Sequence, residues 1–342
     1  MGPVVVIDGL GTLALLAVAP LDPARQRRLA RAQAGLALVR PRDPAESRAA
    51  FGAAEAYVTE QGPVDEGRLA AAPRLRFVQV CGAWADGIDL DACRAHKVTV
   101  SRLDLPTTRA VAEHVLMLAL AAAHRLGPAN AALHGWAPAP PAEEPAVPYP
   151  GGVYNWLGLG GLTVLRGCRL GILGLGDVGA EVARLARRLG LSVAYHRRRR
   201  LPAAVERRLG VSYLDLDALV RTSEILSVHV RRASETLGMV DRAMIRRMPR
   251  GAILIDTSRG GIVDHAALAE ALRDGHLAGA GVDVFPEEPM SPDDPLVGAP
   301  GALLTPHVAG GSIDLFLDEA ALVVGNVRRA LAGAPIRGLL TG

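Results

Sequence analysis

Three side chains that could act together on a small anion occur in well-separated segments of the chain. Arg259 lies in SRGGIVD, Glu288 in DVFPEEP and His307 in LLTPHVAGG, and each follows an apolar run that predicts a β-strand. A guanidinium holds an anion, and a carboxylate can orient an imidazole that transfers a proton near neutral pH. The pattern predicts acid–base chemistry on a small acid.

A glycine-rich run, GLGDVG at Gly174 to Gly179, follows the apolar run at 169–173 and precedes an expected helix at 180–189. Such a run alone is a weak signal in a chain with 38 glycines. Between a strand and a helix it predicts a dinucleotide site, where Gly174 makes the tight turn and Gly176 lets a pyrophosphate approach the backbone. The competing interpretation is a purely structural turn.

The segment after the next expected strand indicates which dinucleotide binds. A carboxylate is typical there for NAD, but the sequence is Tyr195-His-Arg-Arg-Arg-Arg200. Guanidinium groups bind a 2′-phosphate, so Arg197 and Arg198 favour NADP(H), with NAD(H) as the alternative. Because Lys97 is the only lysine among 38 basic residues, arginine-rich composition could also fill this loop. Four arginines without interleaved aromatic residues are a weak nucleic-acid signal.

The elements that must position these residues form two α/β series. Apolar runs at 4–7, 36–39, 55–58, 77–80 and 98–100 alternate with helical stretches, and six more follow at 169–173, 191–195, 225–230, 252–256, 279–284 and 302–305. The second series predicts a doubly wound parallel sheet. Arg259, Glu288 and His307 follow its last three runs, so neighbouring carboxyl ends should present them together.

Helices and loops connect the two series. A helix from about 108 to 125 is expected to stop at Gly127-Pro128 and to bridge two domains, and a helix at 313–331 should return to the first domain. The Pro/Gly-rich segment 136–161 is expected to be a loop or arm.

Composition limits the classes of function. A chain of 342 residues, half of them apolar, predicts two domains, and a net charge of +3 gives no reason to expect a nucleic-acid partner. Cys81, Cys93 and Cys168 have no metal-ligand or disulfide spacing, which favours a reducing cytoplasm. No segment is expected to span a membrane or to act as a signal peptide. The remaining histidines show no zinc spacing, so we expect them on the surface or on helix faces and expect no metal.

Taken in order, these motifs resemble the D-isomer-specific 2-hydroxyacid dehydrogenase family. The resemblance runs from CGAWADGIDLDAC through AVAEHVLMLAL, GILGLGDVG, DTSRGGIVDHAALAEAL and GAGVDVFPEEP to TPHVAGGS. It implies a Rossmann coenzyme domain at residues 105–308 and a smaller flavodoxin-like α/β substrate domain built from residues 1–104 and 309–342. It also implies a homodimer through the coenzyme domain.

The same resemblance implies roles for individual residues. His307 would protonate the carbonyl oxygen, Glu288 would orient the imidazole, and Arg259 would hold the substrate carboxylate and polarise the oxo group. Ala83, Trp84 and Ala85 would join Arg259 in substrate binding; Trp84 could roof a small pocket or pack against the interdomain helix.

Asp283 would contact the nicotinamide carboxamide, or else cap a turn, and Thr107 would be a weaker contact. The implied cofactor-binding residues are Gly174, Leu175, Gly176, Asp177, Val178, Gly179, His196, Arg197, Arg198, Val230, Arg231, Thr257, Ser258, Asp283 and Thr107.

Two positions depart from the family pattern. Arg231-Arg232 replaces a usual proline and apolar residue, and could extend the 2′-phosphate site or cover the adenine. Asp256 replaces a frequent asparagine.

The sequence therefore predicts an NADPH-preferring reductase of a small 2-oxo acid such as glyoxylate or hydroxypyruvate. The alternatives are an enzyme that oxidises phosphite or a small phosphonate, because the same clamp could hold a tetrahedral oxyanion, and a dinucleotide-sensing corepressor-like scaffold.

Overall fold

The computed structural model describes residues 2–8, 21–41, 44–60, 62–82, 85, 87–134, 155 and 158–341. The chain divides into two compact units. One unit contains Met1–Ala110 and Gly310–Gly342, and the other contains Val111–Ala309. The units meet along the chain at 110/111 and 309/310, whereas the sequence places the domain boundaries at 104/105 and 308/309.

The first unit is built on a parallel sheet of five strands. In chain order they are β1 (Val4–Asp8), β2 (Ala37–Val39), β3 (Ala56–Thr59), β4 (Phe77–Cys81) and β5 (Thr99–Leu103). The spatial order is β2-β1-β3-β4-β5, and every pair is parallel. This is the strand order of flavodoxin-like folds, so the predicted architecture is confirmed.

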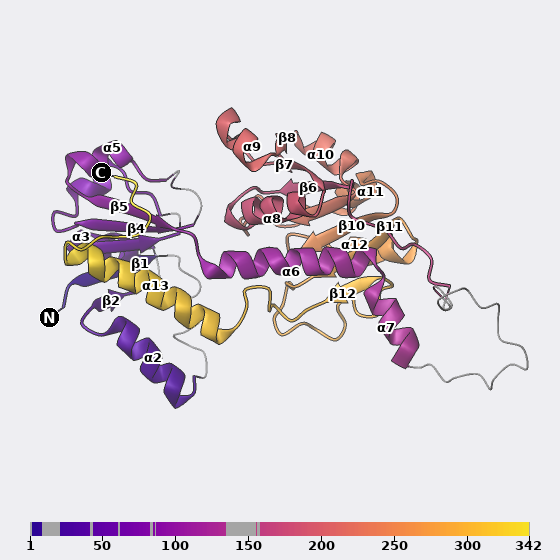
Figure 1. Ribbon diagram of the computed structural model, residues 1–342, viewed down its shortest axis with the longest axis horizontal. Helices are drawn as coiled ribbons and strands as arrows, with labels where there is room; N and C mark the ends of the chain where they lie inside the picture. Colours follow the sequence, from indigo (N-terminus) through magenta and orange to yellow (C-terminus); the bar gives the residue numbers. More distant parts are fainter. Residues whose placement is uncertain are drawn as a thin grey trace, which may run out of the picture. The chain divides into compact units, whose positions relative to one another are not determined.

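Helices cover both faces of this sheet (Figure 1). They are α2 (Pro23–Gln33), α3 (Pro44–Ala53), α4 (Glu66–Ala70), α5 (Leu90–Ala95) and α13 (Ile313–Leu331). Because side chains alternate along a strand, Val5 packs in a core with Leu317 of α13, while Val6 packs in another with Phe51 of α3. The α13 segment thus completes the core of the N-terminal strands.

The second unit contains a parallel sheet of seven strands within the described residues. In chain order they are β6 (Arg169–Leu173), β7 (Ser192–His196), β8 (Ser212–Tyr213), β9 (Ile225–Val228), β10 (Ala252–Asp256), β11 (Leu277–Val282) and β12 (Ala302–Leu304). Their order, β12-β11-β10-β9-β6-β7-β8, reverses direction between β6 and β9. The doubly wound sheet is confirmed, and ligands bind beyond such a reversal point in open α/β sheets.

Six helices lie wholly in this unit: α7 (Leu126–His134), α8 (Asp177–Arg188), α9 (Ala203–Leu209), α10 (Leu216–Thr222), α11 (Arg242–Arg247) and α12 (His265–Arg273). The side chains of Asp215, Asp241 and Asp264 accept backbone hydrogen bonds at the starts of α10, α11 and α12. The same three helices share a core with β9, β10 and β11.

The helix predicted at 108–125 is α6 (Pro106–Ala123), and its predicted end is wrong by two residues. Arg125 has a φ of 54°, which breaks the helix, and α7 starts at Leu126. Pro128 therefore lies in the first turn of a helix, where its missing N–H has no cost. The Gly127-Pro128 pair opens α7 and does not terminate α6.

Across the described residues, no helix is both long and apolar enough to cross a membrane, and no cluster of histidine, cysteine and acidic side chains could hold a metal ion. Most of the predicted arm at 136–161 lies outside the described residues.

Candidate functional site

The segments that carry Arg259, Glu288 and His307 leave three neighbouring strands at the same edge of the second sheet. Arg259 follows β10, Glu288 follows β11 and His307 follows β12, and these strands pair in that order. The carboxyl ends of parallel strands meet at one edge. All three residues belong to the unit Val111–Ala309.

The imidazole and the carboxylate are in direct contact. Nδ1 of His307 lies 2.6 Å from Oε2 of Glu288, and Oε1 of Glu288 accepts a hydrogen bond from the Phe285 N–H at 3.1 Å. A carboxylate only accepts, so Nδ1 carries the hydrogen and Nε2 is the nitrogen left for chemistry. The His307 side chain is 46% exposed, so that nitrogen can be reached by a small molecule.

The charges around Glu288 keep it ionised. Partial burial acts to raise its pKa, but the hydrogen bonds from His307 and the Phe285 N–H, with the charges of His307 and Arg259, outweigh burial and lower the pKa. Glu288 is therefore a carboxylate at neutral pH.

Arg259 reaches this site because its loop lies unusually close to the loop of Glu288. A Cβ at Gly260 would lie 1.7 Å from the carbonyl oxygen of Phe285, so only glycine permits this approach. Nη1 of Arg259 donates to the carbonyl of Ser258 at 2.7 Å, and the residue is exposed. Its remaining donors are available to an anion.

Asp283 holds the turn that carries His307. This fully buried carboxylate accepts hydrogen bonds from the Thr305 hydroxyl at 2.5 Å and from the N–H groups of Val308 and Ala309 at 3.0 and 2.9 Å. His307 itself has a φ of 52°, a conformation that costs energy for a residue with a Cβ. These contacts match the turn-capping interpretation; a contact between Asp283 and a carboxamide stays a prediction.

Sequence reasoning placed the other histidines on the surface or on helix faces. For His276, which is buried between α12 and β11 in the chain, this is wrong, whereas His265 lies on a helix face, as the first residue of α12, but that face is buried. His265 and His276 are buried, the first with Nδ1 2.8 Å from Oδ2 of Asp294 and the second hydrogen-bonded to a backbone carbonyl. His114 was also missed: its Nε2 lies 2.9 Å from Oγ1 of Thr305, in the network behind His307. In the sequence, only the position of His114 in the AVAEHV motif indicated a role for it.

The glycine loop has the local geometry of a phosphate-binding loop. Gly174 has a φ of 94°, and a Cβ there would lie 2.8 Å from the carbonyl of His229. A Cβ at Gly179 would lie 2.8 Å from the Gly174 carbonyl, whereas the space beside Gly176 is open to 4 Å. Gly176 is the N-cap residue of α8, and no side chain caps this helix. An open approach at a helix N-terminus fits a pyrophosphate.

The other residues predicted in this loop have distinct positions. Leu175 is buried, and Asp177 and Val178 form the first turn of α8.

Within the arginine run, Arg200 has a structural role. Arg200 makes two hydrogen bonds of 2.9 Å to Glu206, which also accepts from the Tyr195 hydroxyl at 2.8 Å. The hydrogen bonds from Arg200 and Tyr195 lower the pKa of Glu206. Arg197 and Arg198 precede this cluster, and His196, at the end of β7, has Nδ1 3.0 Å from the Leu214 carbonyl.

The segment after β9, which contains Val230 and Arg231, lies near the arginine run. Hydrogen bonds from its own backbone N–H and from the Ser234 side chain lower the pKa of Glu235. The charge of Arg198 lowers it further, while desolvation acts in the opposite direction. The charge of Arg198 therefore acts on the segment that follows β9.

Two buried polar atoms lie at the carboxyl end of β10. Ser258 donates from its hydroxyl at 2.5 Å and from its N–H at 2.9 Å to Oδ1 of Asp256, while burial raises the pKa of Asp256 to about 6. Oδ2 of Asp256 and the hydroxyl of Thr257 have no hydrogen-bond partner among the described residues. Buried polar atoms without a partner fit a site in which a polar cofactor supplies the missing hydrogen bonds.

The predicted substrate loop is covered only in part. Ala83 and Trp84 lie outside the described residues, and Ala85 is half-buried, with its carbonyl accepting from the Ile88 N–H at 3.0 Å. The Thr107 hydroxyl donates to the buried Glu319 at 2.5 Å. Ala85 and Thr107 belong to the first unit, and their predicted contacts stay predictions.

Comparison with known proteins agrees with these features. Residues 156–309 match the model of the NAD binding domain of D-isomer specific 2-hydroxyacid dehydrogenases. A glyoxylate/hydroxypyruvate reductase B of Pectobacterium carotovorum is 33% identical over 293 residues, which is 85% of this chain and 86% of that protein. A D-3-phosphoglycerate dehydrogenase of Archaeoglobus fulgidus is 32% identical over 284 residues; the match covers 82% of this chain but only 50% of that protein.

Among solved structures, a protein of Thermus thermophilus superimposes over 99% of this chain and 100% of its own, with 29% identity and a TM-score of 0.59. The parallel sheets, the glycine loop and the relatives agree on one conclusion: the chain belongs to the D-isomer-specific 2-hydroxyacid dehydrogenase family of oxidoreductases.

Proposed function

We propose that this protein is an NADPH-preferring reductase that converts a small 2-oxo acid to the D-2-hydroxy acid. The contact between Nδ1 of His307 and Oε2 of Glu288 carries the proposal, because it fixes the imidazole and leaves Nε2 for chemistry, while the loop of the exposed Arg259 lies against the loop of Glu288. This geometry suits proton transfer to an oxygen of a bound anion. The match to a glyoxylate/hydroxypyruvate reductase supports glyoxylate or hydroxypyruvate as the substrate.

Each side chain has a defined task in this reaction. Arg259 binds the substrate carboxylate and polarises the oxo group, which stabilises the alkoxide that develops. His307 donates a proton from Nε2 to that oxygen, and accepts it in the reverse direction. Glu288 stabilises the imidazolium that proton donation requires. A bound reduced nicotinamide would supply the hydride.

The preference for NADPH rests on the charge around the ribose end of the dinucleotide site. No acidic residue follows β7 between His196 and Arg200, and a carboxylate there would repel a 2′-phosphate. Since Arg200 is committed to Glu206, Arg197 and Arg198 are the residues we assign to the 2′-phosphate. Arg231 would extend the same site.

We also propose a homodimer formed through the second unit. Helix α7 has no buried residue, and Leu126 and Leu133 on it are 58% and 50% exposed. Met117 of α6 and Val164 are exposed as well, at 46% and 69%. An apolar surface of this kind supports association with a second copy. Sedimentation equilibrium should give twice the chain mass, and Leu126→Glu with Leu133→Glu should give a monomer.

Steady-state rates test the chemistry. The panel contains glyoxylate, hydroxypyruvate, larger 2-oxo acids and 3-phosphoglycerate, each with the appropriate form of NADP or NAD, and phosphite with both oxidised coenzymes. We expect turnover of a two- or three-carbon 2-oxo acid with NADPH, and a loss of 10²-fold or more in kcat for His307→Gln with coenzyme binding retained. Oxidation of phosphite without 2-oxo acid reduction would refute the substrate assignment.

Coenzyme choice has its own matched test. Arg197→Ala with Arg198→Ala should weaken NADPH binding by at least tenfold and leave NADH binding nearly unchanged. Arg207→Ala with Arg208→Ala removes the same charge from exposed positions on α9 and serves as the control. Equal effects of the two double variants on NADPH would show a general charge effect and would contradict the assignment.

A further inference from the structure

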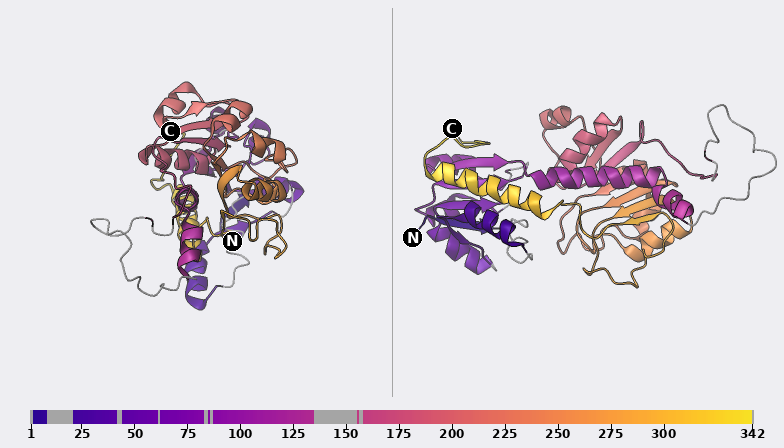
Figure 2. Two further views of the ribbon diagram at one scale, coloured as in Figure 1. Left: turned by 90° about the vertical axis from the view of Figure 1, so that its right-hand side faces the viewer. Right: turned by 60° about the horizontal axis from the view of Figure 1, so that its bottom comes forward.

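A groove in the first unit lies between two helices that are far apart in the sequence. Helices α2 and α13 run side by side in Figure 1 and in the right-hand view of Figure 2, and the groove between them has a volume of about 600 Å³. Small residues line it on both helices: Ala24, Ala32, Ala321 and Gly325. The absence of larger side chains at these positions leaves the space open.

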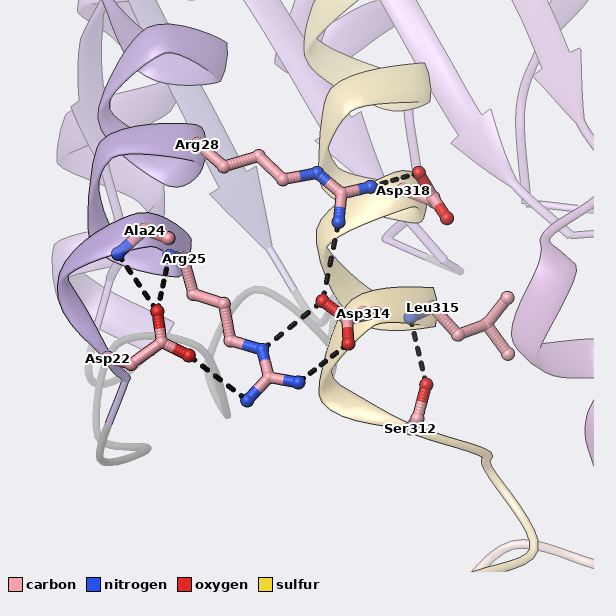
Figure 3. A network of polar contacts seen from close by, with 8 residues as sticks. All are labelled: Asp22, Ala24, Arg25, Arg28, Ser312, Asp314, Leu315 and Asp318. Atoms are coloured by element: carbon pink, nitrogen blue, oxygen red, sulfur yellow. Dashed lines mark hydrogen bonds and ion pairs between the residues drawn. The ribbon is translucent and has the colours of Figure 1, made fainter.

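Four arginines also line this groove: Arg27, Arg28 and Arg31 from α2, and Arg328 from α13. One of them is neutralised. Arg28 pairs with Asp314 at 3.4 Å and also with Asp318, while Arg25 outside the groove binds Asp22 and Asp314 (Figure 3). Ion pairs therefore connect α2 and α13 at this end of the groove.

Among the described residues, none of the other three arginines has a carboxylate partner. Within the part of the chain that the structure describes, no carboxylate lies within 4 Å of Arg27 or Arg31, and both are exposed. Arg328 donates to the backbone carbonyls of Arg31 and Ala34, which leaves its charge unmatched. Arg27 and Arg31 are also four residues apart on one helix, where like charges repel. Bound anionic charge would relieve this repulsion.

We propose that this groove binds a small molecule that carries two or more phosphate groups. Several guanidinium forks around one cavity match the terminal oxygens of phosphate, which accept from more than one donor at once. The volume lies within the range of small-molecule sites. Such a ligand would bridge α2 to α13 and would stabilise the first unit.

Calorimetric titration of the full chain with inorganic pyrophosphate tests the proposal. Saturating NADPH, and NADH in a repeat, keeps the probe from the glycine loop. We expect one site per chain and a melting temperature that rises with pyrophosphate concentration. Arg27→Ala with Arg31→Ala should weaken binding at least tenfold, and Arg27→Lys with Arg31→Lys should weaken it less. The control, Arg207→Ala with Arg208→Ala, should change it less than twofold.

A second variant fills the groove and leaves every charge in place. Ala321 is exposed on α13, so Ala321→Phe should fold normally and still weaken pyrophosphate binding at least tenfold. No saturable binding to the wild type, unchanged affinity in Ala321→Phe, or equal losses in the groove and control arginine variants would each overturn the proposal. None of these measurements depends on turnover, so they stand apart from the proposed reductase activity.

Discussion

Replacing Asp256 by asparagine should change the pH dependence of stability by a predictable amount. Asp256 is 1% exposed, and burial raises its pKa from 3.8 to about 6 against the opposing hydrogen bonds from Ser258. One pKa unit corresponds to about 1.4 kcal/mol, so the buried charge costs about 3 kcal/mol of folding free energy once it is fully formed. This cost is large relative to the stability of a typical domain.

The sign follows from which state holds the proton. Below pH 3.8 the carboxyl is protonated in both the folded and the unfolded chain, and it costs nothing. Between pH 3.8 and about 6 the unfolded chain releases its proton while the folded chain keeps it, so the free energy of unfolding falls as pH rises. Above about pH 6 both states are ionised and the full cost remains.

Asparagine removes the charge and keeps an oxygen for both hydrogen bonds from Ser258. Its amide NH₂ would replace Oδ2, which has no partner among the described residues, and a buried unpaired donor costs about 1–3 kcal/mol at every pH. The difference in stability between Asp256→Asn and wild type should therefore shift in favour of the variant by about 2 kcal/mol between pH 4.5 and 7.5.

Urea unfolding at both pH values measures this difference. Asp293→Asn is the matched control, because Asp293 is exposed and the same atoms change. A stability difference for Asp256→Asn that stays constant within about 0.5 kcal/mol across this range would refute the assignment of a buried, ionised carboxylate.

Other variants separate chemistry, coenzyme choice and packing. Glu288→Gln should lower kcat by about tenfold or more with unchanged coenzyme affinity, measured by steady-state rates and fluorescence titration. Glu206→Gln should lower the ratio of kcat/KM for NADPH to that for NADH by about three- to tenfold, whereas a purely structural role would lower both together. Gly179→Ala should cost about 1–3 kcal/mol in urea unfolding because its Cβ meets a backbone carbonyl, while Gly176→Ala should leave stability nearly unchanged and weaken coenzyme binding.

The sequence predicted both sheets because continuous apolar runs are typical of parallel strands covered on two faces. It missed β8, since Ser212 and Tyr213 form only one two-residue strand with no apolar run. The gathering of Arg259 and His307 at one edge followed from the rule that parallel strands end together.

Individual polar contacts could not be predicted in the same way. Four consecutive arginines look alike in sequence, and only the fold shows that Arg200 is bound by Glu206 and therefore differs from Arg197 and Arg198. Asp283 and His114 presented the same difficulty. Their partners lie 22 or more residues away. The pairing of β11 with β12 brings Thr305 to Asp283, and α6 brings His114 to Thr305.

The buried network behind His307 explains how an exposed imidazole can keep a defined direction. A residue at φ 52° with a 46% exposed side chain would sample other conformations unless its backbone were fixed. Asp283 supplies that constraint by accepting from the two N–H groups directly after His307 and from Thr305 two residues before it. Glu288 then fixes the ring itself. Buried groups thus restrain the backbone of His307, and its exposed imidazole remains free to protonate a substrate.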